Sequence, residues 1–197
     1  LPQGMSTHVF YNRGELVSRA AGTVVRALVE ASVLVVVILY LFLGGVRAAL
    51  VVAATLPLSM LATFLLMHYV GLTANLMSLG GLAIALGMLV DASVVVVENI
   101  ETALAHTPKD GESAKNADRF ALIRDAVSAV SAPMLAGVSI IAIVFLPLLT
   151  LQGLEGKLFA PVALTIVLAL VASVLIAFTV VPALASLLLL SHSSDSP

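Results

Sequence analysis

The chain has 197 residues, of which 61% are hydrophobic and only 10% are charged. An ordinary soluble domain carries roughly 25% charged residues, so this composition indicates a protein that lies in lipid. The net charge of −2 argues against a nucleic-acid partner. The chain has no cysteine, which excludes metal sites built from thiolates.

The first 26 residues are mixed and polar. They open with Leu1-Pro2-Gln3-Gly4, which does not resemble a signal peptide, and we interpret Leu1 as a cut end. A strand-like segment at 7–11 precedes an amphipathic stretch from Glu15 to Arg26. We expect residues 1–26 to form the end of a periplasmic domain and a lead-in helix.

Residues 27–97 are predicted to hold three transmembrane helices, because apolar runs of about 18 or more residues are typical of membrane spans. The first span covers about 28–43 and ends at Gly44-Gly45, and the second covers about 48–67. Pro57 is tolerated in the second span because neighbouring helices can satisfy the carbonyl that it frees.

The third span, about 75–97, is rich in small residues. Gly80, Gly81 and Gly87 would let another backbone approach closely, which is how helices associate where lipid removes the hydrophobic drive. We therefore expect this helix to lie inside a bundle.

Most of the remaining charge lies in residues 98–125, which predict a solvated loop that is helical near each end. Residues 126–190 then predict two further spans, about 126–151 and 158–190, joined by a linker at 152–157. Residues 191–197 are expected to be disordered. The fold class is thus an all-α integral membrane protein with five transmembrane helices. If residues 1–26 belong to a translocated domain, the excess of lysine and arginine places the 98–125 loop in the cytoplasm.

Asp91 is the acid that lies well inside a predicted span. A charged carboxylate at membrane depth costs at least about 2.5 kcal/mol, so an acid there is a functional hypothesis by default. Removal from water favours the neutral carboxyl, which makes Asp91 the candidate proton-relay residue. The alternative is a structural role, in which Asp91 is hydrogen-bonded to a serine or a backbone carbonyl.

Glu98 follows Asp91 by seven residues and would lie on the same helix face, about 10.5 Å away along the axis. It is a possible secondary proton site, or it merely marks the membrane boundary. No predicted span contains lysine or arginine. The cationic partner that a buried aspartate requires is therefore expected from outside this chain.

Met77 and Met88 share the third span with Asp91. Soft thioethers suit Cu(I) or Ag(I), so the two methionines are candidates for a metal path. Methionine is also a common gap-filler in apolar packing, and that interpretation stays open.

The sequence GMLVDASVVVVEN at 87–99 resembles the fourth-helix motif of resistance-nodulation-division (RND) efflux pumps. The run TLQGLEGKLFAP at 150–161 is similar to the heavy-metal branch of that family in particular. Shorter stretches fit in order along nearly the whole chain, namely LPQG at 1–4, VRAAL at 46–50, LPLS at 56–59 and NLMSLGG at 75–81.

The resemblance implies that the chain covers helices two to six in the first half of a bacterial inner-membrane pump with twelve helices. It implies a proton antiporter rather than an enzyme, with protons and a metal cation as its cargo and no cofactor. The implied partners are membrane lipid, the remaining half of the pump, further copies in a homotrimer, a periplasmic adaptor (membrane fusion) protein and an outer-membrane channel. On this resemblance Asp91 is the relay aspartate.

Two departures from family patterns bear on the metal. Drug exporters have a second aspartate where this chain has Ala92, and some divalent-metal pumps have an acid where it has Ala85. A single relay acid is most similar to the copper/silver branch, in which a methionine at the position of Met77 is implied in metal passage. Divalent pumps carry similar methionines, so zinc, cobalt, cadmium and nickel stay possible.

Two other functions compete with metal export. One is an RND relative that exports a non-metal substrate, against which the LEGK sequence at 154–157 argues. The other is a membrane scaffold without transport, in which Asp91 only determines how the helices pack.

Overall fold

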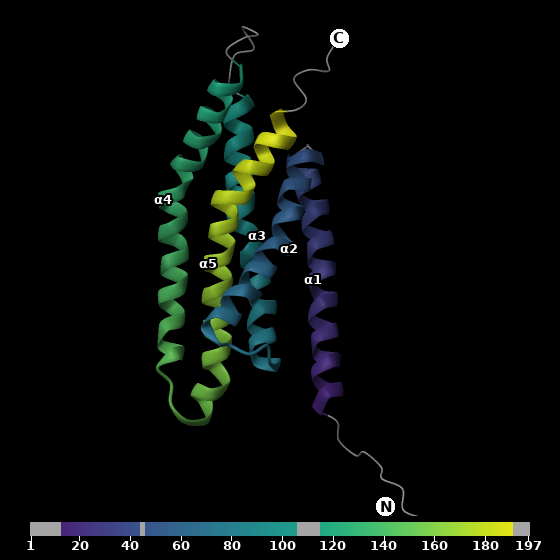
Figure 1. Ribbon diagram of the computed structural model, residues 1–197, viewed down its shortest axis with the longest axis vertical. Coiled ribbons are helices and arrows are strands. Elements are labelled where there is room, and N and C mark those ends of the chain that lie inside the picture. Colours follow the sequence, from purple (N-terminus) through teal and green to yellow (C-terminus); the bar gives the residue numbers. More distant parts are fainter. Residues whose placement is uncertain (1–12, 44–45, 106–114, 191–197) are drawn as a thin grey trace, which may run out of the picture.

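The computed structural model describes residues 13–43, 46–105 and 115–190. Within these ranges every regular element is a helix, and successive helices run in alternate directions (Figure 1). The predicted all-α membrane fold is confirmed. The strand-like segment 7–11 and the tail 191–197 lie outside the described residues. The helices are α1 (Arg13–Leu43), α2 (Val46–Val70), α3 (Leu76–Ala105), α4 (Lys115–Leu149) and α5 (Gly153–Leu190).

Four of the helices, α2 to α5, are long and apolar enough to cross a membrane over their described residues. The first predicted span lies within α1. That helix begins well before the apolar run, and its part from 13 to 30 carries two ion pairs with the favourable four-residue spacing, Glu15 with Arg19 and Arg26 with Glu30.

The connection between α4 and α5 is shorter than predicted. Residues 153–157, which we expected in the linker, form the first turns of α5 instead. Gly153 has a φ of 75°, a left-handed conformation that glycine adopts without strain. A Cβ atom on Gly156 would lie 2.1 Å from the carbonyl oxygen of Leu151. The helix can therefore begin early because two glycines allow a tight turn, which the apolar pattern alone does not reveal.

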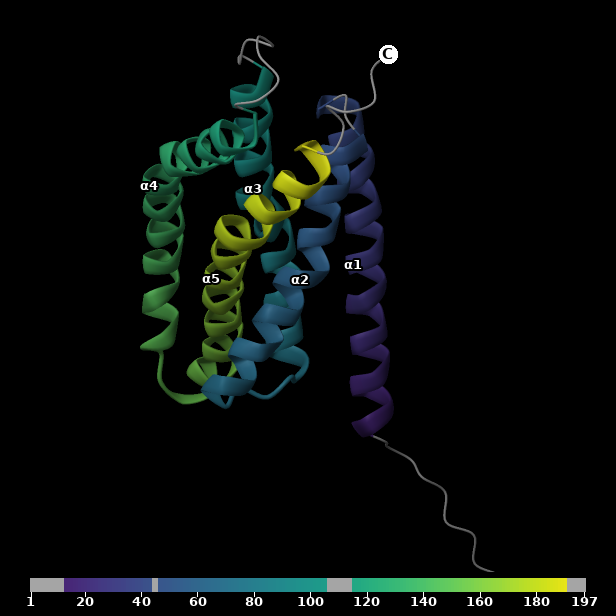
Figure 2. The same ribbon diagram turned by 45° about the horizontal axis from the view of Figure 1, so that its top comes forward.

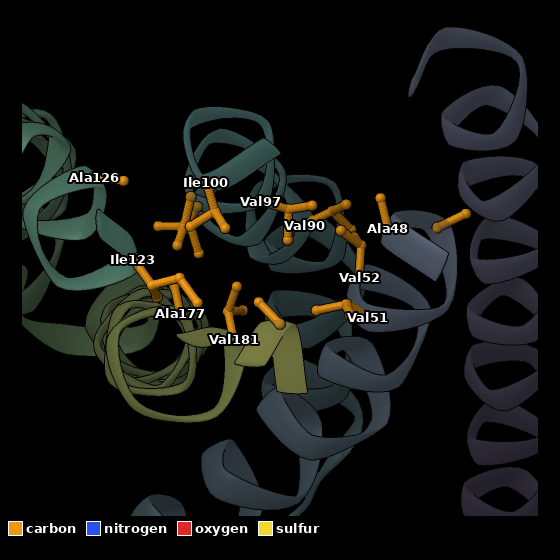
Figure 3. Close-up of a cluster of buried hydrophobic side chains, with 14 of the residues drawn as sticks. Ala48, Val51, Val52, Val90, Val97, Ile100, Ile123, Ala126, Ala177 and Val181 are labelled. Carbon is orange, nitrogen blue, oxygen red and sulfur yellow. The ribbon is translucent and has the colours of Figure 1, made fainter. Parts of the chain in front are cut away.

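α5 lies in the middle of the bundle and packs against α2, α3 and α4. A cluster of buried apolar side chains joins these four helices at one end (Figure 3). Val51 and Val52 come from α2, Val97 from α3 and Val181 from α5, and each of them is fully buried.

A second cluster links α3 to α5 farther along, around Leu89 and Ile166. Near it the two helices come into backbone contact, since a Cβ atom on Gly81 would lie 2.7 Å from the carbonyl oxygen of Val162. The close approach predicted for this helix is confirmed at Gly81. Gly80 and Gly87 face open space within the described chain, so the prediction was wrong for them here.

α1 and α4 form the two outer sides of the bundle in both Figure 1 and Figure 2. None of the residues in the most apolar stretch of α4 is buried, whereas half of those in α3 and α5 are. Large apolar side chains such as Ile140 and Val144 are exposed on α4. Such a surface is suited to lipid or to other apolar helices rather than to water.

Candidate functional site

A pocket of about 640 Å³ lies between α3, α4 and α5. Its wall is apolar, with Val95, Met134 and Leu170 as examples from the three helices. Among the lining residues of the described chain, only Asp91 is charged. The structure thus places the predicted relay acid at a cavity formed by three apolar helices.

Asp91 lies at the midpoint of α3, roughly 21 Å along the axis from either helix end. Its side chain is exposed within this chain, while its neighbours Val90 and Ala92 are buried against the bundle. The carboxyl group therefore faces the pocket side of α3. At that depth in a membrane, whatever covers the pocket determines whether the carboxyl meets water, lipid or protein.

No lysine or arginine lines the pocket among the residues that the structure describes. The ion pairs recorded within the described ranges lie elsewhere, in the exposed parts of α1 and between Arg124 and Asp125 in α4. The expectation that a cationic partner for Asp91 comes from outside the chain stays a prediction. The described residues also contain no group of three or more histidine, aspartate or glutamate side chains that could hold a metal ion.

Hydrogen bonds hold α3 at its start, its middle and near its end. At the start, the side-chain oxygen of Asn75 accepts from the backbone N–H groups of Met77 and Ser78, both at 2.9 Å, as a helix N-cap does. In the middle, the hydroxyl of Ser173 donates to the carbonyl of Leu89 at 2.7 Å.

Near the end of α3, the side-chain amide of Asn99 donates to the backbone carbonyl of Ala126 in α4. This bond joins α3 to the next helix, α4, and that of Ser173 joins α3 to α5. Together with the cap they define where the segment that carries Asp91 lies relative to α4 and α5.

The structure separates the other predicted site residues. Glu98 is exposed and lies beyond the part of α3 that lines the pocket, which ends at Val95. Met88 lines the pocket beside Asp91, whereas Met77 lies near the first turn of α3, outside the lining. The two methionines are eleven positions apart, which corresponds to roughly 16 Å of helix, so they do not form one site.

Two pocket residues were missed from the sequence, Met134 in α4 and Ser173 in α5. A signal for Met134 was present, because the residues of α4 that line the pocket recur at helical spacing along the sequence. No comparable signal marked Ser173, since one serine in an apolar span has several possible neighbours. The residues of α4 that line the pocket are Val130, Pro133, Met134, Gly137, Val138 and Ile141.

The model of the AcrB/AcrD/AcrF family matches residues 1–196. The chain belongs to this family. The predicted membership of the RND efflux pumps is therefore confirmed, and the chain is a multi-pass segment of an inner-membrane protein of this family.

Proteins named for metal resistance or cation efflux are among its relatives. The chain is 45% identical over 196 residues to Protein HelA of Legionella pneumophila and 43% identical over 188 residues to the cobalt-zinc-cadmium resistance protein CzcA of Cupriavidus metallidurans. It is 39% identical over 186 residues to the cation efflux system protein CusA of Escherichia coli K12. These alignments cover 99%, 95% and 93% of the chain.

The fold has a counterpart among solved structures. A crystal structure of a heavy metal efflux pump matches with a TM-score of 0.71 and 37% identity, over 92% of this chain and 17% of that one. The chain spans about 18% of the length of the three relatives named above. What a whole pump transports and assembles with is therefore a matter of proposal for this segment.

Proposed function

We propose that this chain is part of a proton-driven antiporter that exports heavy-metal cations through a tripartite efflux complex. The observation that carries the proposal is the placement of Asp91, a single carboxyl at the midpoint of a membrane-spanning helix and at the wall of an apolar pocket. The membership of the chain in a transporter family supports the same interpretation.

The proposed cycle follows from the chemistry of a carboxyl in a poor solvent. Asp91 takes up a proton from the periplasm and becomes neutral, which removes its attraction to a cation on the part of the pump outside this chain. The helices then rearrange and open the metal site to the periplasm. Each proton that moves down the membrane potential supplies about 2.3 kcal/mol per 100 mV.

The assembly is part of the proposal. A homotrimer joined to a periplasmic adaptor protein and an outer-membrane channel would carry the cation out of the cell. The apolar outer faces of α1 and α4 support contact with lipid or with the rest of the pump, because they expose large side chains such as Leu41 and Ile143.

Cu(I) or Ag(I) is the proposed cargo. Ala85 and Ala92 leave Asp91 as the single acid of its stretch of α3, and the thioethers of Met88 and Met134 line its pocket. In this scheme Met77 and Met88 lie along the metal path, and Glu98 is a secondary proton site at the membrane boundary. The similarity to CzcA favours a second candidate, export of divalent cations.

The decisive test is Asp91→Asn in the full-length pump that carries this segment. Asparagine keeps the shape but cannot take up a proton, so we expect metal resistance to be lost while the amount of protein in the membrane is unchanged. Asp125→Asn, which neutralises an exposed aspartate of α4, is the matched control and should retain resistance.

Each possible result has a defined meaning. Full metal resistance with asparagine at position 91 contradicts the proposal. Loss of assembly instead of transport would favour the scaffold. Growth on separate copper, silver, zinc, cobalt, cadmium and nickel media identifies the metal. Resistance to none of these metals, in cells whose growth still requires Asp91, would indicate a non-metal substrate.

A further inference from the structure

A hydrogen bond between α3 and α4 lies at one end of the pocket that contains Asp91. The lining of the pocket ends at Val95 on α3 and begins at Val130 on α4. One helical turn beyond each of these residues, the side-chain amide of Asn99 donates to the backbone carbonyl of Ala126. Because the two helices run in opposite directions, Val95 and Val130 lie at the same end of the pocket, and the bond joins the helices just beyond them.

α4 is attached to the bundle at the same place. Among its described side chains, only Ile123 and Ala126 are buried. Figure 3 shows both of them with Ile100 of α3 in the cluster of buried apolar side chains. Val130, which lines the pocket, packs against that cluster. The cluster and the hydrogen bond therefore form the end wall of the pocket.

Charged side chains lie directly beyond this end wall. Glu98 lies beside the hydrogen bond in α3, and Arg124 and Asp125 lie beside it in α4. All three side chains are exposed. They are suited to water, whereas Asp91 lies about 12 Å of helix away on the other side of the wall. The end wall thus separates the proposed proton site from a polar surface.

We propose that Asn99 is a positioning residue whose bond to the Ala126 carbonyl closes this end of the pocket against water from the charged side. The proposal rests on the proposed function, in which Asp91 takes its proton from the periplasm, so a pocket open at both ends would let protons leak. A single hydrogen bond between membrane helices changes an equilibrium by a factor of about three to ten. The bond is therefore weak enough to open during a transport cycle.

The first test measures how fast a cysteine at the closed end reacts. The chain has no cysteine, so Val95→Cys can be introduced into the full-length pump once any other cysteines have been replaced. A charged, membrane-impermeant maleimide is added to vesicles of each orientation. Asn99→Ala should speed the reaction from the charged side about three- to tenfold and leave the rate from the opposite side unchanged. Asn99→Asp keeps the size of the side chain but lacks the amide donor, and should act in the same way.

Two controls distinguish closure of the pocket from loosening of the fold. Ser131→Ala removes a hydroxyl that donates to Ser128 within α4, so it should leave the rate of Val95→Cys unchanged. Ile166→Cys reports on the core of the bundle, because this side chain of α5 is 1% exposed. It should stay unreactive when Asn99 is replaced by alanine.

The second test measures proton flux into proteoliposomes that hold a pH gradient and no metal. Asn99→Ala should raise this flux by a similar factor, because the pocket is then open to water more often. Addition of Asp91→Asn to that variant should return the flux to the level of the unmodified pump, since Asp91 is the proposed proton carrier.

The outcomes separate the two proposals. An unchanged rate of Val95→Cys in both Asn99 variants overturns the closure, and so does a faster rate that Ile166→Cys shares. Faster labelling without extra proton flux, flux that persists in the double variant, or metal transport that survives Asp91→Asn overturns the proposed function. The labelling of Val95→Cys still reports in those cases whether Asn99 closes the pocket.

Discussion

α3 and α4 are equally apolar to a first approximation, but they occupy very different surroundings. Half of the most apolar stretch of α3 is buried and none of that of α4 is, although both helices line the same pocket. α3 contacts α5 through small residues such as Gly81 and Ala85, whereas α4 turns large residues such as Ile140 outward. In a membrane, small side chains therefore mark the contacts between helices, and hydrophobicity alone does not.

Gly81→Ala tests this contrast with the largest expected effect. The added Cβ would lie 2.7 Å from the backbone oxygen of Val162, so α3 and α5 would have to move apart. We expect a loss of about 2 to 3 kcal/mol in the free energy of unfolding, typical of overpacking. Gly80→Ala is the matched control, because a Cβ there meets nothing within 4 Å.

Chemical unfolding of the two glycine variants in detergent, followed by circular dichroism, provides the measurement. Equal stability of both variants would show that the contact of α3 with α5 is not tight. The comparison of α3 with α4 would then lose its main support.

Ile166→Ala is expected to have the next largest effect. Ile166 of α5 is 1% exposed and packs in the cluster with Leu89, so its truncation leaves a cavity. We expect the free energy of unfolding to fall by about 1 to 2 kcal/mol, which is below the cost in a water-soluble core. The cost is smaller because lipid or detergent, rather than water, surrounds this side chain when the helices are separated.

Ile140→Ala in α4 is the control for Ile166→Ala, since Ile140 is 63% exposed. It should change the unfolding midpoint little when both variants are measured in the same detergent. A larger effect at Ile140 than at Ile166 would mean that α4 is covered by protein that packs on it.

Asn75→Ala should have the smallest effect of the three. It removes the acceptor for two backbone N–H groups at the start of α3, and loss of such a cap costs about 1 kcal/mol. Amide hydrogen exchange in the first turn of α3 should rise, while exchange around Asp91 stays unchanged. Faster exchange throughout α3 would contradict a local role for the cap.

Much of the fold could be predicted, because membrane spans are long apolar runs and the lipid requires each of them to be a helix. The helix ends were less predictable. α1 begins at Arg13 and α3 reaches Ala105, beyond their apolar runs, because a helix continues in water wherever its residues favour it. The early start of α5 depended on the backbone freedom of Gly153, which composition does not reveal.

The candidate site, like the fold, could be predicted only in part. Asp91 stood out in the sequence because a carboxyl in an apolar span is costly. Met134 and Ser173 did not, because their significance comes from their place in helices packed beside α3, although both residues lie more than 40 positions after Asp91 in the chain. Met77, in turn, shares a helix with Asp91 but not its pocket.

The sequence by itself determined that the chain lies in a membrane and that its spans are helices, and it singled out Asp91 as the candidate proton-relay residue, since each of these depends on the cost of polar groups in lipid. Only the tertiary structure decided which side chains face Asp91 and which glycine brings α3 against α5. Those choices depend on how helices distant in the chain pack, and apolar side chains of similar hydropathy do not specify that arrangement.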